Sequence, residues 1–141
     1  MIIRKATMND LMSIIDLNKK LFHHDHKFDD TLDLSWPDKN NKYYKNRIRG
    51  PNSIAYVAEI NKKIVGYAIA SIIKAETYRK IESKRIAELE NIFIIKEYSK
   101  WAKSKGIKRL RIVASVKNEK AVRTYKKSGF KELNLVLEKT I

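Results

Sequence analysis

The sequence has 141 residues, 43% of them hydrophobic, which predicts one folded domain over residues 1–141 and excludes a disordered chain. It contains no cysteine, which excludes disulfides and thiolate metal sites, and no apolar run approaches the roughly 20 residues of a membrane-spanning helix. The net charge of +15 suits a polyanionic ligand, but the basic residues are spread along the chain and glutamine is absent, a bias that favours a heat-adapted source.

The chain begins with a β-branched segment, residues 2–6, that predicts a first strand. No signal peptide is expected before it, so a cytoplasmic protein is predicted. Apolar residues then recur at helical spacing and predict a helix from about Asn9 to Phe22. His23, His24 and His26 follow beside an aspartate, which suggests zinc. Adjacent helical residues do not face one another, however, so no metal site is predicted.

The next segment, Phe28 to Pro37, is irregular, acidic and aromatic. A loop that combines Asp29, Asp30 and Asp33 with Trp36 could contact a cationic substrate. It could equally be a surface loop held by one buried tryptophan. Residues 38–49 then permit a helix, which Gly50 and the proline after it should end.

Two apolar segments, residues 53–59 and 64–73, predict a β-hairpin with a turn at residues 60–63. The polar segment 74–85 predicts a loop. Residues 86–95 predict another strand, whose continuous apolar end indicates burial on both faces.

The remaining pattern predicts the end of a helix at residues 101–105, stopped by Gly106, and then a strand over 107–114. A helix over 118–127 and a last strand over 130–138 complete the chain. This order predicts an α/β (α+β) fold with a mixed, mostly antiparallel sheet flanked by helices.

The spacing between the two strands that end at Ile95 and begin at Ile107 is short. Only about eleven residues separate them, whereas a parallel pair needs a crossover of a dozen or more residues, usually with a full helix. Either the pair is antiparallel or residues are missing around Tyr98, Ser99 and Lys100. We expect a missing segment, because residues 101–106 read as the last turns of a longer helix.

Three motifs together resemble the GNAT superfamily of N-acetyltransferases. The strongest is Asn118…Ala121…Tyr125-Lys-Lys-Ser-Gly-Phe130, which is similar to the family's Asn-x-x-Ala-x-x-x-Tyr-x-x-x-Gly-Phe. The other two are Ile64-Val-Gly-Tyr and the strand from Glu90 to Tyr98. The chain departs from the family after Tyr98, where the Arg/Gln-x-x-Gly-x-Gly/Ala pyrophosphate loop is absent.

The resemblance implies acetyl-CoA as cosubstrate and direct attack by a primary amine in a ternary complex. It implies that Tyr125 is the general acid that protonates the leaving thiolate. It also implies that Asn118 contacts the pantetheine arm, although a helix N-cap needs no further role. The backbone of Ile92, Phe93 and Ile94 should pair with the pantetheine amides.

A general base is expected on the strand before the missing loop. Glu88 and Glu90 alternate with Leu89, so both face one side, where a carboxylate could deprotonate the amine or be part of a solvated or salt-bridged surface. We favour Glu90, which lies closer to the expected reaction centre.

The acceptor class and two other functions remain open. A small-molecule or protein amine is the expected acceptor, a homodimer is left open, and neither a membrane nor nucleic acid is expected as a partner. One alternative is a basic α/β domain that binds nucleic acid. The other is a non-catalytic GNAT-fold protein that binds a ligand or partner.

Overall fold

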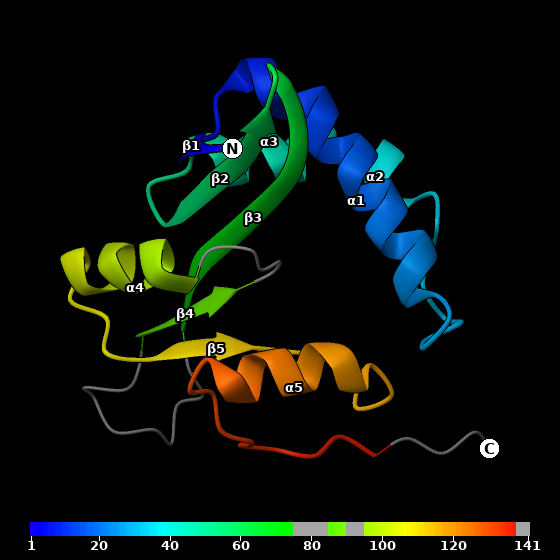
Figure 1. Ribbon diagram of the computed structural model, residues 1–141, viewed down its shortest axis with the longest axis vertical. Coiled ribbons are helices and arrows are strands. Elements are labelled where there is room, and N and C mark those ends of the chain that lie inside the picture. The colour runs from blue at the N-terminus through cyan, green and yellow to red at the C-terminus, as the bar shows by residue number, and fades with distance from the viewer. Residues whose placement is uncertain (75–84, 90–94, 138–141) are drawn as a thin grey trace.

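The computed structural model describes residues 1–74, 85–89 and 95–137 (Figure 1). Its elements, in chain order, are β1 (Ile2–Lys5), a 3-10 turn (Met8–Asp10), α1 (Leu11–Asp25), α2 (Trp36–Lys39), α3 (Asn41–Arg49), β2 (Ser53–Ile60), β3 (Lys63–Lys74), β4 (Arg85–Leu89), α4 (Ile95–Ser104), β5 (Leu110–Ile112) and α5 (Glu119–Lys127).

In the described part of the chain, five strands form one sheet in the order β1-β2-β3-β4-β5. Neighbours are antiparallel except β4 and β5, which are parallel. The predicted hairpin is confirmed: Asn61 and Lys62 both have positive φ, 49° and 61°, as a tight turn between twisted strands requires. The predicted mixed, mostly antiparallel α/β fold is therefore confirmed.

Both faces of the central strands are buried. Val57, Tyr67 and Ile69 pack against α1 and α3. Alternate residues such as Ala68 and Ala70 face the other way and pack with Tyr98 of α4. Because successive side chains of a strand point to opposite faces, α1 and α4 lie on opposite sides of the sheet (Figure 1). Burial on both faces explains why these strands are almost continuously apolar.

Helix α1 begins close to its predicted start but continues past Phe22 to Asp25. Its buried residues Leu11, Ile14, Ile15 and Asn18 recur at helical spacing and form the face that packs on the sheet. The extra turn carries Asp25 beyond the end that the apolar pattern predicted. Within the described residues, no cluster of His, Asp or Glu side chains could hold a metal ion, and no helix is long and apolar enough to cross a bilayer.

The expectation of a missing segment is wrong, because it assumed a strand that continues to Ile95. The predicted strand over 86–95 ends at Leu89 in the described part, and Ile95 is instead the first residue of the ten-residue helix α4. Helix α4 runs without a break through residues 98–101. The crossover therefore has residues 90–109 available, enough for the parallel connection that β4 and β5 make. Short apolar runs do not distinguish strand from helix, which explains the error.

The last predicted strand is also wrong as far as the structure describes it. Residues 130–137 follow α5 in no regular structure, and Leu133, Leu135 and Leu137 are 56%, 67% and 83% exposed. Alternating apolar residues favour a strand only when a neighbouring strand and a core receive them. The predicted loop at residues 74–85 lies outside the described residues apart from its two ends.

Candidate active site

The carboxyl ends of the two parallel strands mark one end of the candidate site. Strands β4 and β5 pair from Ala87 and Leu110 to Leu89 and Ile112. Helix α4 begins at Ile95, shortly after β4 ends. The first backbone N–H groups of a helix have no partner within the helix and attract anions, so the start of α4 could hold phosphate groups.

A polar row crosses the sheet next to this end. Glu88 lies opposite Ser71 of β3 on one side and opposite Arg111 of β5 on the other. Ser71 faces the same side as Ile69, so the row faces α1 and α3. The Arg111 Nε donates to Glu88 Oε2 at 2.6 Å, which confirms the salt-bridged interpretation of Glu88. A carboxylate held in this way is less available as a base.

Four of the six predicted site residues cannot be placed. Glu90, Ile92, Phe93 and Ile94 lie outside the described residues. Their proposed roles therefore stay predictions, and Asn118 and Tyr125 are the predicted site residues that can be located.

Helix α5 holds both of these residues. The Asn118 side chain caps it, because its Oδ1 accepts a hydrogen bond from the backbone N–H of Ala121 at 3.2 Å. Gly129, with φ of +90°, follows the end of the helix as predicted. Tyr125 is half-buried, with its ring edge-to-face on Phe130 at 6.4 Å between centroids.

The hydroxyl of Tyr125 is held in its protonated form. Burial raises its pKa above the ordinary value of 10.0, and the carboxylate of Asp25 raises it further. This coupling joins the end of α1 to α5, which lie 100 positions apart in the sequence. In the same way, Lys117 acts on the carboxylate of Asp29. Figure 1 shows the C-terminal end of α1 on the same side of the molecule as the start of α5.

The acidic loop between α1 and α2 is built from local turns. Asp29 accepts hydrogen bonds from the backbone and hydroxyl of Thr31 at 3.1 and 2.6 Å. Asp33 does the same with Ser35 at 2.9 and 2.6 Å. These bonds lower the pKa of each carboxyl. Two of the three predicted acceptor contacts therefore have a structural role, which is typical of Asp followed by Ser or Thr two residues later.

A pocket of about 430 Å³, here called the aromatic pocket, lies between α1, this loop and α3. Phe22 and Trp36 form its walls as stacked rings 5.8 Å apart, and Tyr43 meets Trp36 edge-to-face at 5.0 Å. Asp25 also lines it. In the sequence, Asp25 stands among the three histidines, and that pattern predicts no role for it in acceptor binding. The available signal was its spacing, since Phe22 and Asp25 lie three apart on one helix face.

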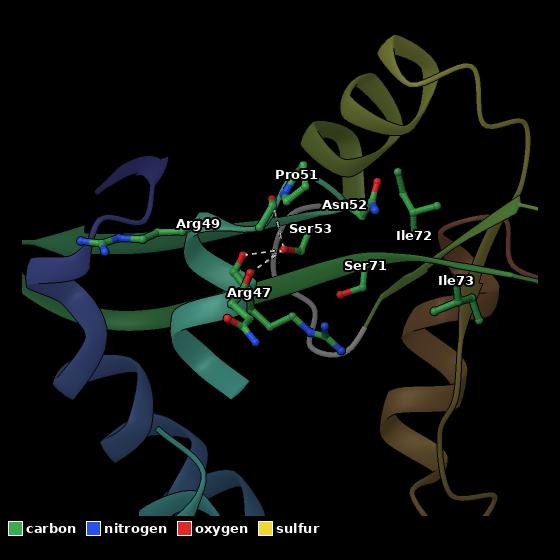
Figure 2. A pocket seen from close by; sticks show the side chains of 10 residues that line it. Arg47, Arg49, Pro51, Asn52, Ser53, Ser71, Ile72 and Ile73 are labelled. Atoms are coloured by element: carbon green, nitrogen blue, oxygen red, sulfur yellow. Dashed lines mark hydrogen bonds between the residues drawn. The ribbon is translucent and has the colours of Figure 1, made fainter. Parts of the chain in front are cut away.

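A second pocket of about 420 Å³ lies where α3 ends and β2 begins (Figure 2). The Ser53 hydroxyl lies 3.0 Å from the carbonyl oxygens of Asn46 and Arg47, which it bonds at the end of α3. Arg47, Arg49 and Ser71 also line this pocket, and among the described residues no carboxylate does. Its charge does not suit a cationic amine.

Comparison with known proteins gives one family and a set of similar folds. The sequence profile of the Acetyltransferase (GNAT) family matches residues 19–100, more than half of the chain. The Asn118–Phe130 motif lies outside that range. A search of curated protein sequences gave no significant match.

Among solved structures, a mutant of the BH1408 protein from Bacillus halodurans superposes with a TM-score of 0.86 at 16% identity, over 100% of this chain and 99% of that chain. A predicted acetyltransferase with acetyl-CoA from Clostridium acetobutylicum has a TM-score of 0.74 at 21% identity, over 99% and 95%. An aminoglycoside 6′-N-acetyltransferase from Acinetobacter haemolyticus has a TM-score of 0.76 at 16% identity, over 100% and 98%. At these identities the likeness is one of fold.

Proposed function

Because the chain belongs to the GNAT family of acetyltransferases, we propose that it transfers an acetyl group from acetyl-CoA to a primary amine, within a single domain over residues 1–141. The observation that carries the proposal is Tyr125, a half-buried tyrosine whose hydroxyl has a pKa that is raised by burial and by Asp25, a carboxylate that lines a pocket. That arrangement joins an acid to a place where an amine can bind.

The described residues fit acetyl-CoA in two respects. The cofactor carries a pyrophosphate and a 3′-phosphate, and α4 begins at Ile95, where the first N–H groups of a helix have no partner within the helix itself. Helix α5 begins with the Asn118 cap and exposes Lys120, Arg123 and Lys127. These cations favour a ligand that carries phosphate groups. When bound, acetyl-CoA supplies the thioester that the amine attacks.

Tyr125 then acts as the general acid. The amine nitrogen bonds to the thioester carbonyl carbon, the carbon–sulfur bond breaks, and the sulfur leaves as a thiolate that takes the Tyr125 proton. A raised pKa keeps this proton on the oxygen at neutral pH, as an acid requires. Asn118, at the start of the same helix, would contact the pantetheine arm.

The amine must lose a proton before or during its attack. Glu90 is the proposed base, directly or through a water molecule. Glu88 is the poorer candidate, since Arg111 already holds its carboxylate. The backbone of Ile92, Phe93 and Ile94 is proposed to pair with the pantetheine amides.

The test measures acetyl-CoA turnover with a panel of amines. A thiol reagent detects the free CoA that each reaction releases. The protein has no cysteine, so the reagent reads only the product. We expect Tyr125→Phe to lower kcat by about 10²-fold, the lower range for a positioned acid. The melting-temperature rise caused by acetyl-CoA should remain. Tyr56→Phe, a tyrosine of β2 that contacts Tyr98, is the matched control and should keep its kcat.

A second candidate function is ligand binding without catalysis, and the chain's departure from the family motif supports it. The family's glycine-containing pyrophosphate loop is absent after Tyr98, and the chain's four glycines lie elsewhere. If acetyl-CoA raises the melting temperature but no amine releases CoA, the chain is a ligand-binding member of the family. If acetyl-CoA has no effect and a random duplex binds with steep salt dependence, the net charge of +15 reflects nucleic-acid binding.

A further inference from the structure

The carboxylate of Asp25 is the least satisfied charge in the aromatic pocket. It is half-buried at the end of α1, and among the described residues no group donates a hydrogen bond to it. Burial is the main reason that its pKa is raised. Asp33, the other carboxylate of the pocket, is exposed and already accepts bonds from Ser35. A cation entering the pocket therefore gains most by approaching Asp25.

The walls of the pocket also favour a cation. The faces of Phe22, Trp36 and Tyr43 carry the negative potential of aromatic rings, which attracts ammonium and guanidinium groups. The same attraction is present beside the pocket, where the Arg47 guanidinium lies 4.6 Å from the centre of the Tyr43 ring. Carboxylate and rings thus act on the same kind of ligand.

The floor of the pocket is rigid. Asn18, 6% exposed, lines it and is fixed from both sides. The Tyr44 hydroxyl donates to Asn18 Oδ1 at 2.7 Å, and Asn18 Nδ2 donates to the Tyr67 hydroxyl. Because this amide is bonded on both ends, it holds α1 against α3 and β3 and keeps the walls in place.

Asp25 links the aromatic pocket to the proposed acid. Asp25 lines the pocket and its charge acts on Tyr125. A ligand with one cationic group at Asp25 can extend a second nitrogen toward the Tyr125 hydroxyl. With a volume of about 430 Å³, the pocket admits a small molecule rather than a folded partner.

We infer that the aromatic pocket binds the acceptor, and that the acceptor is a small diamine or polyamine whose one ammonium group rests between Asp25 and the rings of Trp36 and Tyr43 while a second, neutral amine is acetylated. This inference rests on the proposed function and adds the class of amine.

The test compares 1,4-diaminobutane with 1-aminobutane, which has the same chain but lacks the second nitrogen. Wild-type protein should prefer the diamine in kcat/KM by at least about tenfold, the value of one hydrogen bond to a charged group. Asp25→Asn should remove most of this preference. Trp36→Leu should weaken the preference for the diamine. The control is Asp29→Asn, which should keep the preference, because Asp29 lies in the loop between α1 and α2 but does not line the pocket.

Two measurements separate the inference from failure of the enzyme or of the fold. Calorimetric binding of 1,4-diaminobutane without acetyl-CoA should be lost in Asp25→Asn, even if no amine turns over. Asp25→Asn should not lower the melting temperature, because it neutralises a half-buried carboxylate to which no described residue donates a hydrogen bond. Equal kcat/KM for the two amines in an active enzyme, or a preference for a lysine-containing peptide, would overturn the inference and leave the proposed function standing. An unchanged diamine affinity in Asp25→Asn would also overturn it.

Discussion

The N-terminal scaffold, formed by β1, β2, β3, α1 and α3, is packed far more densely than the C-terminal arm, formed by β5, α5 and residues 113–137. The scaffold buries Ile14, Ile15 and Val57 to 1% exposure or less. In the arm, α5 has no fully buried residue, and Val113 and Val136 are 76% and 80% exposed. The pocket that we propose for the acceptor belongs to the scaffold, whereas the proposed acid, Tyr125, belongs to the arm.

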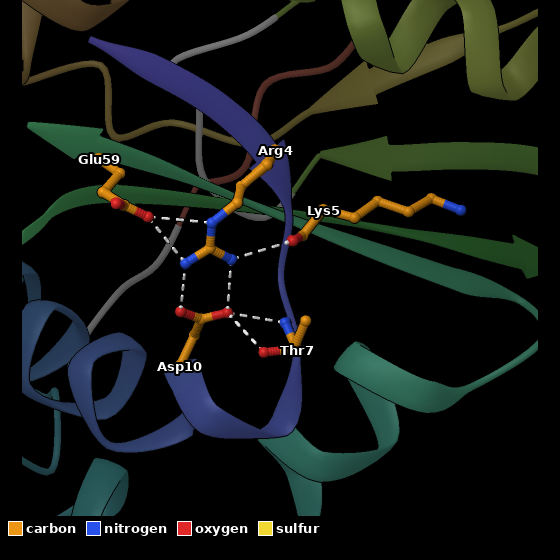
Figure 3. A network of polar contacts seen from close by, with 5 residues as sticks. All are labelled: Arg4, Lys5, Thr7, Asp10 and Glu59. Atoms are coloured by element: carbon orange, nitrogen blue, oxygen red, sulfur yellow. Dashed lines mark hydrogen bonds and ion pairs between the residues drawn. The ribbon is translucent and has the colours of Figure 1, made fainter. Parts of the chain in front are cut away.

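A network of charges also strengthens the scaffold (Figure 3). Arg4 of β1 bonds both carboxylate oxygens of Asp10 at 2.8 and 2.9 Å and Glu59 of β2 at 3.0 Å. Asp10 in turn accepts from the backbone and hydroxyl of Thr7 at 2.8 and 3.0 Å. The network joins the edge strand to the start of α1. In the arm, by contrast, both side chains of the ion pair between Lys126 and Glu132 are exposed.

Because the arm buries little apolar surface, we expect the scaffold to set the stability of the protein and the arm to gain protection when a ligand binds. Local stability follows buried apolar contact, and a region with little of it opens at a lower free energy. The prediction with the largest effect tests this on two isoleucines. Ile14→Ala should lower the free energy of unfolding by about 2–5 kcal/mol, and Ile112→Ala in β5 by less than half as much. Urea unfolding of both variants measures the two values, and equal losses would contradict the comparison.

The second prediction concerns the cofactor. Acetyl-CoA at 100 times its dissociation constant should stabilise the protein by about 2.7 kcal/mol. Slower amide hydrogen exchange should be concentrated in α5 and the rest of the arm, because the scaffold is already closely packed. If exchange instead slows to the same extent in β2 and β3, the cofactor does not act mainly on the arm. Mass spectrometry of peptides from each region measures this.

The third prediction uses the pH dependence of the network. The Arg4 guanidinium lowers the pKa of Asp10 from 3.8 to about 2. The resulting stabilisation, about 2 kcal/mol, is therefore present above pH 3.8 and is lost as the pH falls toward 2. Asp10→Asn should be less stable than the wild type by this amount at pH 7, and the two should converge in acid. A difference that stays constant from pH 7 to pH 2 would argue against this ion pair.

The sequence predicted most of the scaffold because its signals are local. The period of α1, the hairpin at Asn61 and Lys62, and the cap at Asn118 each depend on residues a few positions apart. Its predictions are wrong where contacts between residues far apart in the sequence determine the structure, as at the end of the strand before Ile95. The coupling of Asp25 to Tyr125 spans 100 positions, so no spacing rule could have brought them together.

The smallest expected effect lies in the arm. Lys126 Nζ lies 2.7 Å from Glu132 Oε1, but their side chains are 54% and 76% exposed. Water and salt screen such a pair, and holding two long side chains in place offsets much of the attraction. Glu132→Gln should therefore leave the urea midpoint unchanged within error, at both low and high salt. A clear loss of stability that disappears in 1 M salt would show that charge holds the arm in place and would narrow the contrast with the scaffold.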